Sequence, residues 1–334
     1  MVTRRHRATP KFADSGSRPL FGLRRRSGRA TNEGVNAQTI EPELIFDGRA
    51  ELAEGPVWHG DALWWVEITA GRLNRLEPDT GLVHTRAFGA PLGAAVPTAE
   101  PDQWLLALQG KIDLLDWSTG NRRTVNAIEA DRPDNRPNDG KCDRSGRFWI
   151  GTMGTAAAPE AGSLYRLDPD GSLERTLEGV TISNGLAWNG ANDRFFYIDT
   201  PTRRIDLFDF DAATGAIANR RHLREFDPED GNPDGMAIDS DDNLWVAMWG
   251  GGAVLKIDGR TGETLGRVAM PVSKPTSCCF GGPHLDVLYI TSAKIGLDPE
   301  RAASQPGAGS VFACTPGVAG TPVVPARIEI GPVS

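Results

Sequence analysis

The sequence has little of what marks a secreted, disulfide-bonded protein or a membrane protein. Its 334 residues include four cysteines, Cys142, Cys278, Cys279 and Cys314, and none of them lies in a Cys-x-x-Cys pair. So few thiols in this arrangement favour a reducing compartment, and we expect a cytoplasmic protein. No stretch approaches the roughly 18 consecutive apolar residues that a membrane-spanning helix needs. We therefore expect no membrane partner.

Several common catalytic motifs are also absent from the sequence. There is no Gly-x-Ser-x-Gly elbow of a serine hydrolase, and no glycine-rich phosphate loop that follows a strand and opens a helix. The five histidines show no HExxH pattern or other close pairing, so a histidine-based zinc site is not predicted. Nothing near Cys278 or Cys279 would lower a thiol pKa, and we expect both side chains to be packed in the core.

The charge is unevenly distributed along the chain, whose net charge is −8. Basic residues are frequent near the start of the chain: Arg4, Arg5, Arg7, Lys11, Arg18, Arg24, Arg25, Arg26 and Arg29. This stretch lacks the apolar core of a signal peptide, and we predict a disordered extension over residues 1–40, or a start codon placed too far upstream. The acidic remainder disfavours a nucleic-acid partner and suits cation binding.

Internal repeats determine the predicted fold. A strand that ends in an acidic turn and a glycine appears at residues 71–81 and recurs at 110–120, 162–171, 204–215, 252–262 and, in degenerate form, from 309. A segment rich in aromatic and aliphatic residues lies upstream of each copy. A third short segment lies further upstream, and its six copies begin near Glu54, Ala94, Asn138, Asn184, Asp234 and Pro275.

Three such strands and an outer fourth make a propeller blade, and a spacing of about 40 to 50 residues fits one blade per repeat. We therefore predict an all-β fold, a six-bladed β-propeller with four-stranded blades that forms a single domain over residues 41–334. An α/β fold is excluded because no amphipathic helical stretch of about ten residues separates the strands. The strand at residues 44–47 is predicted to be the outer strand of the last blade, so that an N-terminal strand closes the ring.

Four of the six copies of the third short segment begin with a carboxylate or amide side chain next to a glycine. These are Glu54-Gly55, Asn138-Asp139-Gly140, Asn184-Gly185 and Asp234-Gly235. Each one alone could be an ordinary hairpin turn. All four share the same phase of the blade, however, and innermost strands of a propeller meet at one channel mouth. Carboxylates that converge there would repel each other unless a cation lay between them. Oxygen ligands suit Ca²⁺, Mg²⁺ or Mn²⁺, and carboxylates also accept Zn²⁺ or Fe²⁺.

At these segments the sequence resembles the SMP-30/gluconolactonase family, which includes regucalcin, gluconolactonases and bacterial sugar lactonases. The matching stretches are 53–58 (AEGPVW), 136–143 (RPNDGKCD), 146–153 (GRFWIGTM), 182–188 (ISNGLAW), 233–239 (PDGMAID) and 276–282 (TSCCFGG). They keep their order over about residues 44 to 314. The resemblance implies a six-bladed propeller and a metal-dependent hydrolase, a carboxylic ester hydrolase that opens sugar-acid lactones in carbohydrate catabolism.

The resemblance also implies roles for individual residues. Glu54, Asn184 and Asp234 match the three protein ligands of one divalent cation, and Asp234 matches the proposed general base. Arg136 matches a substrate-binding arginine, and Asn138 matches a residue that contacts the substrate or the metal's water. Some members carry a glutamate shortly after the GTM segment, where this chain reads GTAAA at residues 154–158.

The expected small-molecule partner is a sugar lactone. Two alternatives stay open, a calcium-binding regulatory protein like regucalcin and an esterase acting on non-sugar lactones or phosphotriesters. The sequence does not indicate an oligomeric state.

Overall fold

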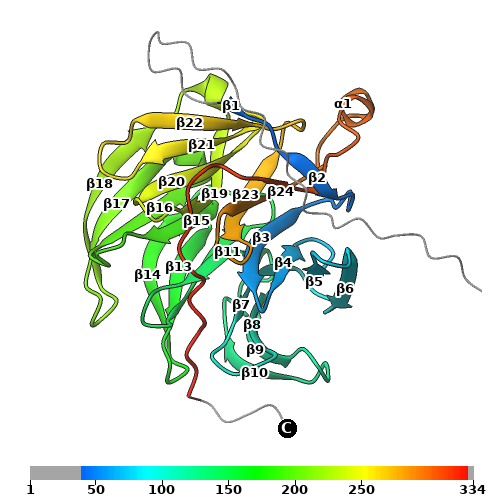
Figure 1. Ribbon diagram of the computed structural model, residues 1–334. Helices are drawn as coiled ribbons and strands as arrows, with labels where there is room; N and C mark the ends of the chain where they lie inside the picture. The colour runs from blue at the N-terminus through cyan, green and yellow to red at the C-terminus, as the bar shows by residue number, and fades with distance from the viewer. Residues whose placement is uncertain (1–38, 330–334) are drawn as a thin grey trace, which may run out of the picture.

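A computed structural model describes residues 39–329, which form six sheets around a central channel, antiparallel except for one short strand (Figure 1). The predicted fold is confirmed. Residues 1–38, most of the predicted extension, lie outside the described residues. No helix of the described part is long and apolar enough to cross a membrane.

Each blade runs from an inner strand at the channel to an outer strand at the rim. Blade 1 contains β3 (Ala53–His59), β4 (Ala62–Glu67), β5 (Arg72–Glu77) and β6 (Leu82–Ala87), and blade 2 contains β7 (Leu92–Pro97), β8 (Gln103–Leu108), β9 (Lys111–Asp116) and β10 (Arg122–Ala127). Blade 3 contains β11 (Asn135–Cys142), β12 (Phe148–Gly154), β13 (Gly162–Leu167) and β14 (Leu173–Val180), and blade 4 contains β15 (Ser183–Trp188), β16 (Arg194–Asp199), β17 (Arg204–Phe210) and β18 (Ile217–Glu225). Blade 5 contains β19 (Asn232–Ile238), β20 (Asn243–Trp249), β21 (Ala253–Asp258) and β22 (Thr264–Ala269), and blade 6 contains β23 (Pro275–Gly281), β24 (Val287–Ser292) and β25 (Val311–Cys314).

The N-terminal part of the described chain closes the ring. Strand β2 (Glu43–Phe46) pairs antiparallel with β25 and becomes the outer strand of blade 6, as predicted. Strand β1 (Thr39–Ile40) pairs parallel with β22 of blade 5, a contact that the repeats did not predict. The connections hold two 3₁₀ turns, η1 (Thr200–Thr202) and η2 (Pro228–Asp230), and the short helix α1 (Pro299–Ser304).

The core lies between the faces of neighbouring blades. Inner strands such as β7, β15 and β23 are buried along their whole length, because sheets pack against both of their faces. Between blades 3 and 4 the space is filled by an aromatic cluster, in which Trp149 of β12 meets Trp188, Phe195 and Phe210 of blade 4. The aromatic residues of the second repeat therefore supply the packing that holds one blade against the next.

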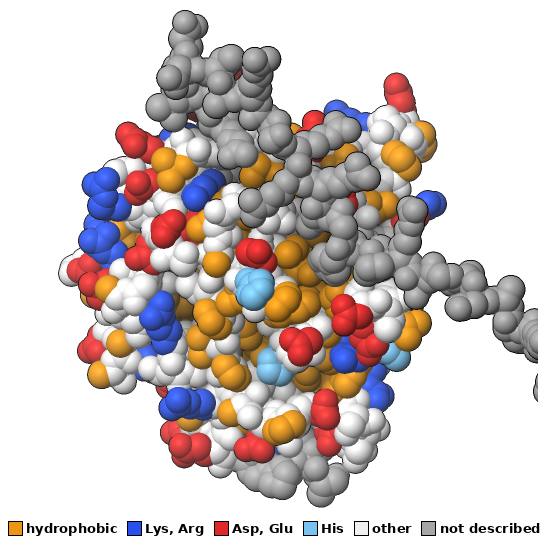
Figure 2. Space-filling model, in the orientation of Figure 1, with side chains coloured by type: hydrophobic (Ala, Val, Ile, Leu, Met, Phe, Trp, Pro, Cys, Tyr) orange, Lys and Arg blue, Asp and Glu red, His pale blue; other side chains and the backbone are white. Residues whose placement is uncertain are grey.

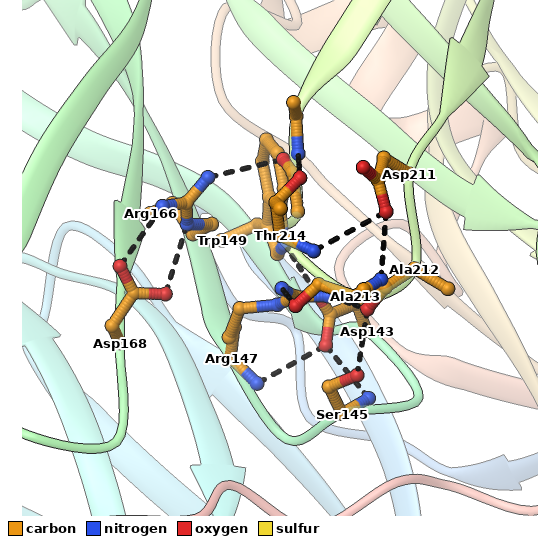
Figure 3. Close-up of polar contacts among 12 residues, drawn as sticks. Asp143, Ser145, Arg147, Trp149, Arg166, Asp168, Asp211, Ala212, Ala213 and Thr214 are labelled. Carbon is orange, nitrogen blue, oxygen red and sulfur yellow. Dashed lines mark hydrogen bonds and ion pairs between the residues drawn. The ribbon is translucent and has the colours of Figure 1, made fainter.

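A buried ion pair of blade 3 also contacts blade 4 through its arginine (Figure 3). The Asp143 carboxylate is fully buried and accepts hydrogen bonds from Arg147 Nε at 2.6 Å and Trp149 Nε1 at 3.0 Å. Arg147 in turn donates to the backbone carbonyls of Ala212 and Ala213, in the turn between β17 and β18. We call Asp143 and Arg147 with these carbonyls the inter-blade clamp.

The C-terminal segment, residues 315–329, crosses the face of the ring at which the inner hairpins turn (Figure 1). Its backbone bonds to turns of several blades, including Gly320 N–H to the Leu285 carbonyl and Ala326 N–H to the Pro97 carbonyl. Hydrophobic side chains gather around the centre of this face (Figure 2). Residues 321–325 of the segment line a channel cavity of about 440 Å³ together with the inner strands. The leading ends of the inner strands lie at the opposite end of the channel.

Candidate functional site

All six inner strands shift register near their leading ends. The shifts lie between Glu54 and Val57, Leu92 and Ala94, Pro137 and Gly140, Asn184 and Leu186, Pro233 and Met236, and Pro275 and Ser277. A β-bulge turns side chains out of the regular alternation and often lies next to a functional site. The four oxygen-bearing motifs of the sequence coincide with four of these bulges.

Glycine is required in these motifs for two different structural reasons. Gly55 adopts a positive φ of 51°, a conformation that disfavours other residues. Gly235 needs close packing instead, because a Cβ there would lie 2.5 Å from the Cβ of Ser277 in blade 6. The Gly55 N–H donates to the Glu54 carboxylate at 2.8 Å, and the Gly235 backbone N–H lowers the pKa of the Asp234 carboxyl. Each glycine therefore both permits the bulge and acts on the carboxylate that precedes it.

Glu54 and Asp234 form an acidic pair at the channel end. Their exposed fractions are 4% and 6%, and their carboxyl groups are close enough to interact electrostatically. Burial raises the pKa of both groups well above the usual carboxyl range, and the negative charge of Asp234 raises the pKa of Glu54 further. The nearby carboxylate of Asp139 has the same effect on both. Such a pair ionises readily only where positive charge compensates it.

Arg136 of β11 supplies part of that positive charge. Its guanidinium interacts electrostatically with Glu54 and Asp234, and burial lowers the pKa of Arg136 to about 10, so it stays charged at neutral pH. Nη1 donates to the Pro137 carbonyl at 2.9 Å and to Asn138 Oδ1 at 2.7 Å. The guanidinium therefore links the acidic pair to the amides of the site.

Two buried amides continue this arrangement from blade 3 to blade 4. Asn138 Nδ2 donates to Asn184 Oδ1 and to the Ser183 carbonyl, both at 2.9 Å. Asn184 Nδ2 donates to Thr200 Oγ1 at 2.7 Å. Together with the acidic pair, which acts electrostatically on Arg136, these residues place all five sequence-predicted site residues at one end of the channel.

Two acidic residues with buried side chains near the site were not predicted to have a role from the sequence. Asp139 follows Asn138, lines the channel cavity and accepts the Gly140 N–H at 2.7 Å; burial raises the pKa of its carboxyl, which the charge of Lys141 partly offsets. Its position directly before Gly140, in the motif Asn138-Asp139-Gly140, could have identified it.

Glu129 is the second such acid, and it holds together three strands of blade 3. It has a positive φ of 47° and accepts hydrogen bonds from Asn135 of β11, Thr152 of β12 and Tyr165 of β13 at 3.0 to 3.1 Å. Asn135 directly precedes Arg136, so Glu129 fixes the strand that carries the arginine. No sequence pattern identifies this residue, because its partners are brought together only by the folded blade.

The donor set fits a divalent cation with oxygen ligands. Two carboxylates and the amide oxygens of two asparagines are the ligand types that Ca²⁺, Mg²⁺ and Mn²⁺ prefer. The described residues contain no group of three or more His, Cys, Asp or Glu side chains placed to hold a metal ion. The candidate set of Glu54, Asp234 and Asn184 takes only two of its ligands from those residue types and the third from an amide.

The raised carboxyl pKa values predict how a cation should stabilise the fold at different pH. Below about pH 4 the carboxyls are protonated in both the folded and the unfolded chain. As the pH rises, the unfolded chain loses these protons first, so the stability that Glu54 and Asp234 contribute is lost as the pH passes through their raised folded values. A cation would remove that penalty. Saturating Ca²⁺ or Mn²⁺ should therefore raise Tm more at pH 8 than at pH 5.

Differential scanning fluorimetry of metal-stripped protein, with and without the ion, measures this difference. The double variant Glu54→Gln, Asp234→Asn is the control and should show no pH-dependent gain. An equal gain at both pH values in the wild type would contradict the assignment of these two acids.

The cysteines do not contribute a nucleophile to this site. All four are free and buried, and burial raises the pKa of the Cys278 thiol to about 12. Cys278 Sγ donates to the Trp245 carbonyl at 3.2 Å. The predicted core placement of Cys278 and Cys279 is confirmed.

Comparison with known proteins gives the following matches. The model of a family described as the SMP-30/Gluconolactonase/LRE-like region matches residues 52–294. Regucalcin of Gallus gallus is 38% identical over 295 residues, which cover 86% of this chain and 98% of that protein. The crystal structure of a calcium-binding protein, regucalcin, from Agrobacterium tumefaciens superposes with a TM-score of 0.83 at 27% identity, and covers 86% of this chain and 98% of its own. A luciferin-regenerating enzyme structure has a TM-score of 0.80 at 32% identity, over 84% of this chain and 97% of its own.

Proposed function

This chain belongs to the SMP-30/gluconolactonase/LRE-like family, and from that premise we propose that it is a metal-dependent lactonase that opens the lactone ring of sugar acids. One observation carries the proposal: two buried, mutually repelling carboxylates meet a charged arginine and two oriented amides at one end of the channel. This arrangement combines a site for one divalent cation with hydrogen-bond donors for an oxygen-rich substrate. The partner we propose is a small sugar lactone, and neither a nucleic acid nor a membrane.

Hydrolysis of a lactone needs a polarised carbonyl, an activated water and stabilisation of the tetrahedral oxyanion. Glu54, Asn184 and Asp234 would hold a divalent cation, which would supply Lewis-acid polarisation of the carbonyl and make the attacking water more acidic. The Asp234 carboxylate accepts a proton from the attacking water as the new C–O bond forms. The same proton then goes to the ring oxygen as the ring C–O bond breaks. A carboxylate that holds a cation is a weak base. Asp234 would therefore act mainly by positioning the water and by passing its proton on to the ring oxygen.

Arg136 and Asn138 orient the substrate in this mechanism. The guanidinium stays charged at neutral pH and has donors beyond the two that bind the Pro137 carbonyl and Asn138. Hydrogen bonds from a charged donor to hydroxyl or carbonyl oxygens are stronger than neutral ones. The pair therefore favours hydroxylated lactones over apolar ones.

A substrate panel tests this proposal. The four aldonolactones gluconolactone, xylonolactone, galactonolactone and arabinonolactone are compared with hydroxyl-poor lactones, phosphotriesters and simple esters in a pH-indicator assay. At least one aldonolactone should be hydrolysed faster than every hydroxyl-poor compound. Arg136→Ala should raise KM for that aldonolactone by about 10- to 100-fold, because it removes charged hydrogen bonds worth about 1.5–3 kcal/mol. Equal rates on apolar lactones would favour the alternative esterase.

A second candidate function is cation binding without catalysis. It is favoured by the similarity to regucalcin, since the Agrobacterium tumefaciens relative is named a calcium-binding protein. This function predicts that the same residues bind Ca²⁺ while no compound of the panel is hydrolysed above its spontaneous rate.

A further inference from the structure

We propose that Thr200 is a positioning residue. It fixes the orientation of the Asn184 side-chain amide, so that Asn184 Oδ1 and not the NH₂ group faces the cation. This inference rests on the proposed function in one respect, that Asn184 belongs to a cation site. It assigns a role to a residue outside the ligand set.

Thr200 joins the two blades that carry Asn184 and Asp234. It follows β16 directly and begins the turn η1. Its Oγ1 accepts a hydrogen bond from Asn184 Nδ2 at 2.7 Å and donates one to the Pro233 carbonyl at 2.8 Å. Asn184 lies in blade 4, and Pro233 directly precedes Asp234 in blade 5. One hydroxyl group therefore spans the two elements that supply two of the three proposed ligands.

The two ends of the hydrogen-bonded chain fix its direction. Arg136 at one end can only donate, and the Pro233 carbonyl at the other end can only accept. Between them the donors all point the same way, from Arg136 to Asn138, from Asn138 to Asn184, and from Asn184 to Thr200. A reversed Asn184 amide would place its NH₂ against the NH₂ of Asn138. It would also require the Thr200 hydroxyl to donate to Asn184 and leave the Pro233 carbonyl.

This direction matters for a cation. Among the hydrogen bonds of residues 39–329, Asn184 Oδ1 accepts one, from Asn138, so a lone pair remains for an ion. A reversed amide would present N–H dipoles with their positive ends toward the ion. Groups that orient a metal ligand through a hydrogen bond typically change metal affinity by about 10- to 100-fold when they are lost.

The backbone of Thr200 is held independently of its side chain. Its N–H donates to the Ile182 carbonyl at 3.1 Å, and its carbonyl accepts from the Arg203 N–H at 3.0 Å. Pro201 follows at the start of the turn, where no N–H is needed. A change of the hydroxyl alone should therefore leave the turn in place, so that Thr200→Val, which is nearly isosteric, tests the hydroxyl.

The experiment measures Mn²⁺ and Ca²⁺ binding to the full chain by isothermal titration calorimetry, with Thr200→Val, Thr200→Ser and the wild type. Thr200→Val should weaken the Kd by about 10- to 100-fold, while the metal-free protein keeps a Tm within a few degrees of the wild type. Thr200→Ser keeps the hydroxyl and should bind like the wild type. Wild-type affinity in Thr200→Val, or equal weakening in both variants, would overturn the proposal.

A double-mutant cycle separates orientation from general damage. The carboxylate of an Asn184→Asp variant has two equivalent oxygens. Either oxygen can face the cation, so the orienting hydrogen bond with Thr200 should no longer affect cation affinity in this background. Adding Thr200→Val to Asn184→Asp should change the Kd by less than about threefold, which means that the two substitutions are strongly coupled. Independent, additive losses would contradict the orienting role.

Failure of the lactonase proposal would look different in these measurements. Wild-type protein that binds the ion and hydrolyses no lactone would contradict the proposed function and leave the Thr200 result unchanged.

Discussion

Glu54→Gln and Asp234→Asn are each expected to abolish measurable cation binding and to lower lactone hydrolysis by about a thousandfold or more. Each change removes one of two carboxylates from a three-ligand set, and Asp234→Asn also removes the proton acceptor. Both variants should fold. Because an amide relieves the repulsion between two buried carboxylates, the metal-free variants should be at least as thermally stable as the metal-free wild type.

Calorimetric titration with Mn²⁺ and a hydrolysis assay at saturating ion measure the two effects. Asp139→Asn is the matched control, since Asp139 is another buried carboxylate beside the site that accepts the N–H of the following glycine. Its charge acts on the pair without a place in the proposed ligand set, so its removal should weaken the Kd by less than about tenfold. Loss of binding in Asp139→Asn together with normal binding in Glu54→Gln would show that the ligands are assigned wrongly.

Asp143→Ala should reduce the free energy of unfolding by about 3–5 kcal/mol, because breaking a buried ion pair leaves one charge without a partner. The substitution leaves Arg147, whose side chain is 6% exposed, without its carboxylate and Trp149 Nε1 without its acceptor (Figure 3). Denaturation by urea measures the loss. Since the inter-blade clamp lies at the end of β11 remote from Arg136, the cation affinity of the folded variant should be unchanged.

The surface pair of Asp47 and Arg49 provides the comparison for this effect. It has a similar N–O distance of 2.8 Å, but both side chains are largely in solvent. Asp47→Ala should therefore change stability little. If Asp143→Ala is as mild as Asp47→Ala, the clamp does not stabilise the ring in the way that its burial indicates.

The fold could be predicted because its repeat is written along the whole chain. The same three segments recur at a nearly constant spacing, so six blades and the closing strand at residues 44–47 followed from the period alone. Strand β1 and the C-terminal segment could not be predicted in this way. Each occurs once, and the contacts of Ala326 with blade 2 and of Thr39 with blade 5 exist only when the ring has closed.

In the candidate site, too, residues at repeated positions could be predicted and residues at non-repeated positions could not. Glu54, Asn184 and Asp234 were identifiable because each stands beside a glycine at the same phase of its blade, and Asn138 because it stands two residues before one at that phase. Thr200 and Glu129 act across strands or blades from loops that differ between repeats, so neither occupies a repeated position. Their partners are chosen by packing, which a periodic pattern does not encode.

The most direct test of the account is the hydrolysis of gluconolactone by the full chain before and after removal of bound metal. Metal-stripped protein should show only the spontaneous rate, and addition of Ca²⁺, Mn²⁺, Zn²⁺, Mg²⁺ or Fe²⁺ should restore turnover in the wild type but not in Asp234→Asn. Undiminished hydrolysis by the metal-stripped protein, or restored hydrolysis in Asp234→Asn, would contradict the account.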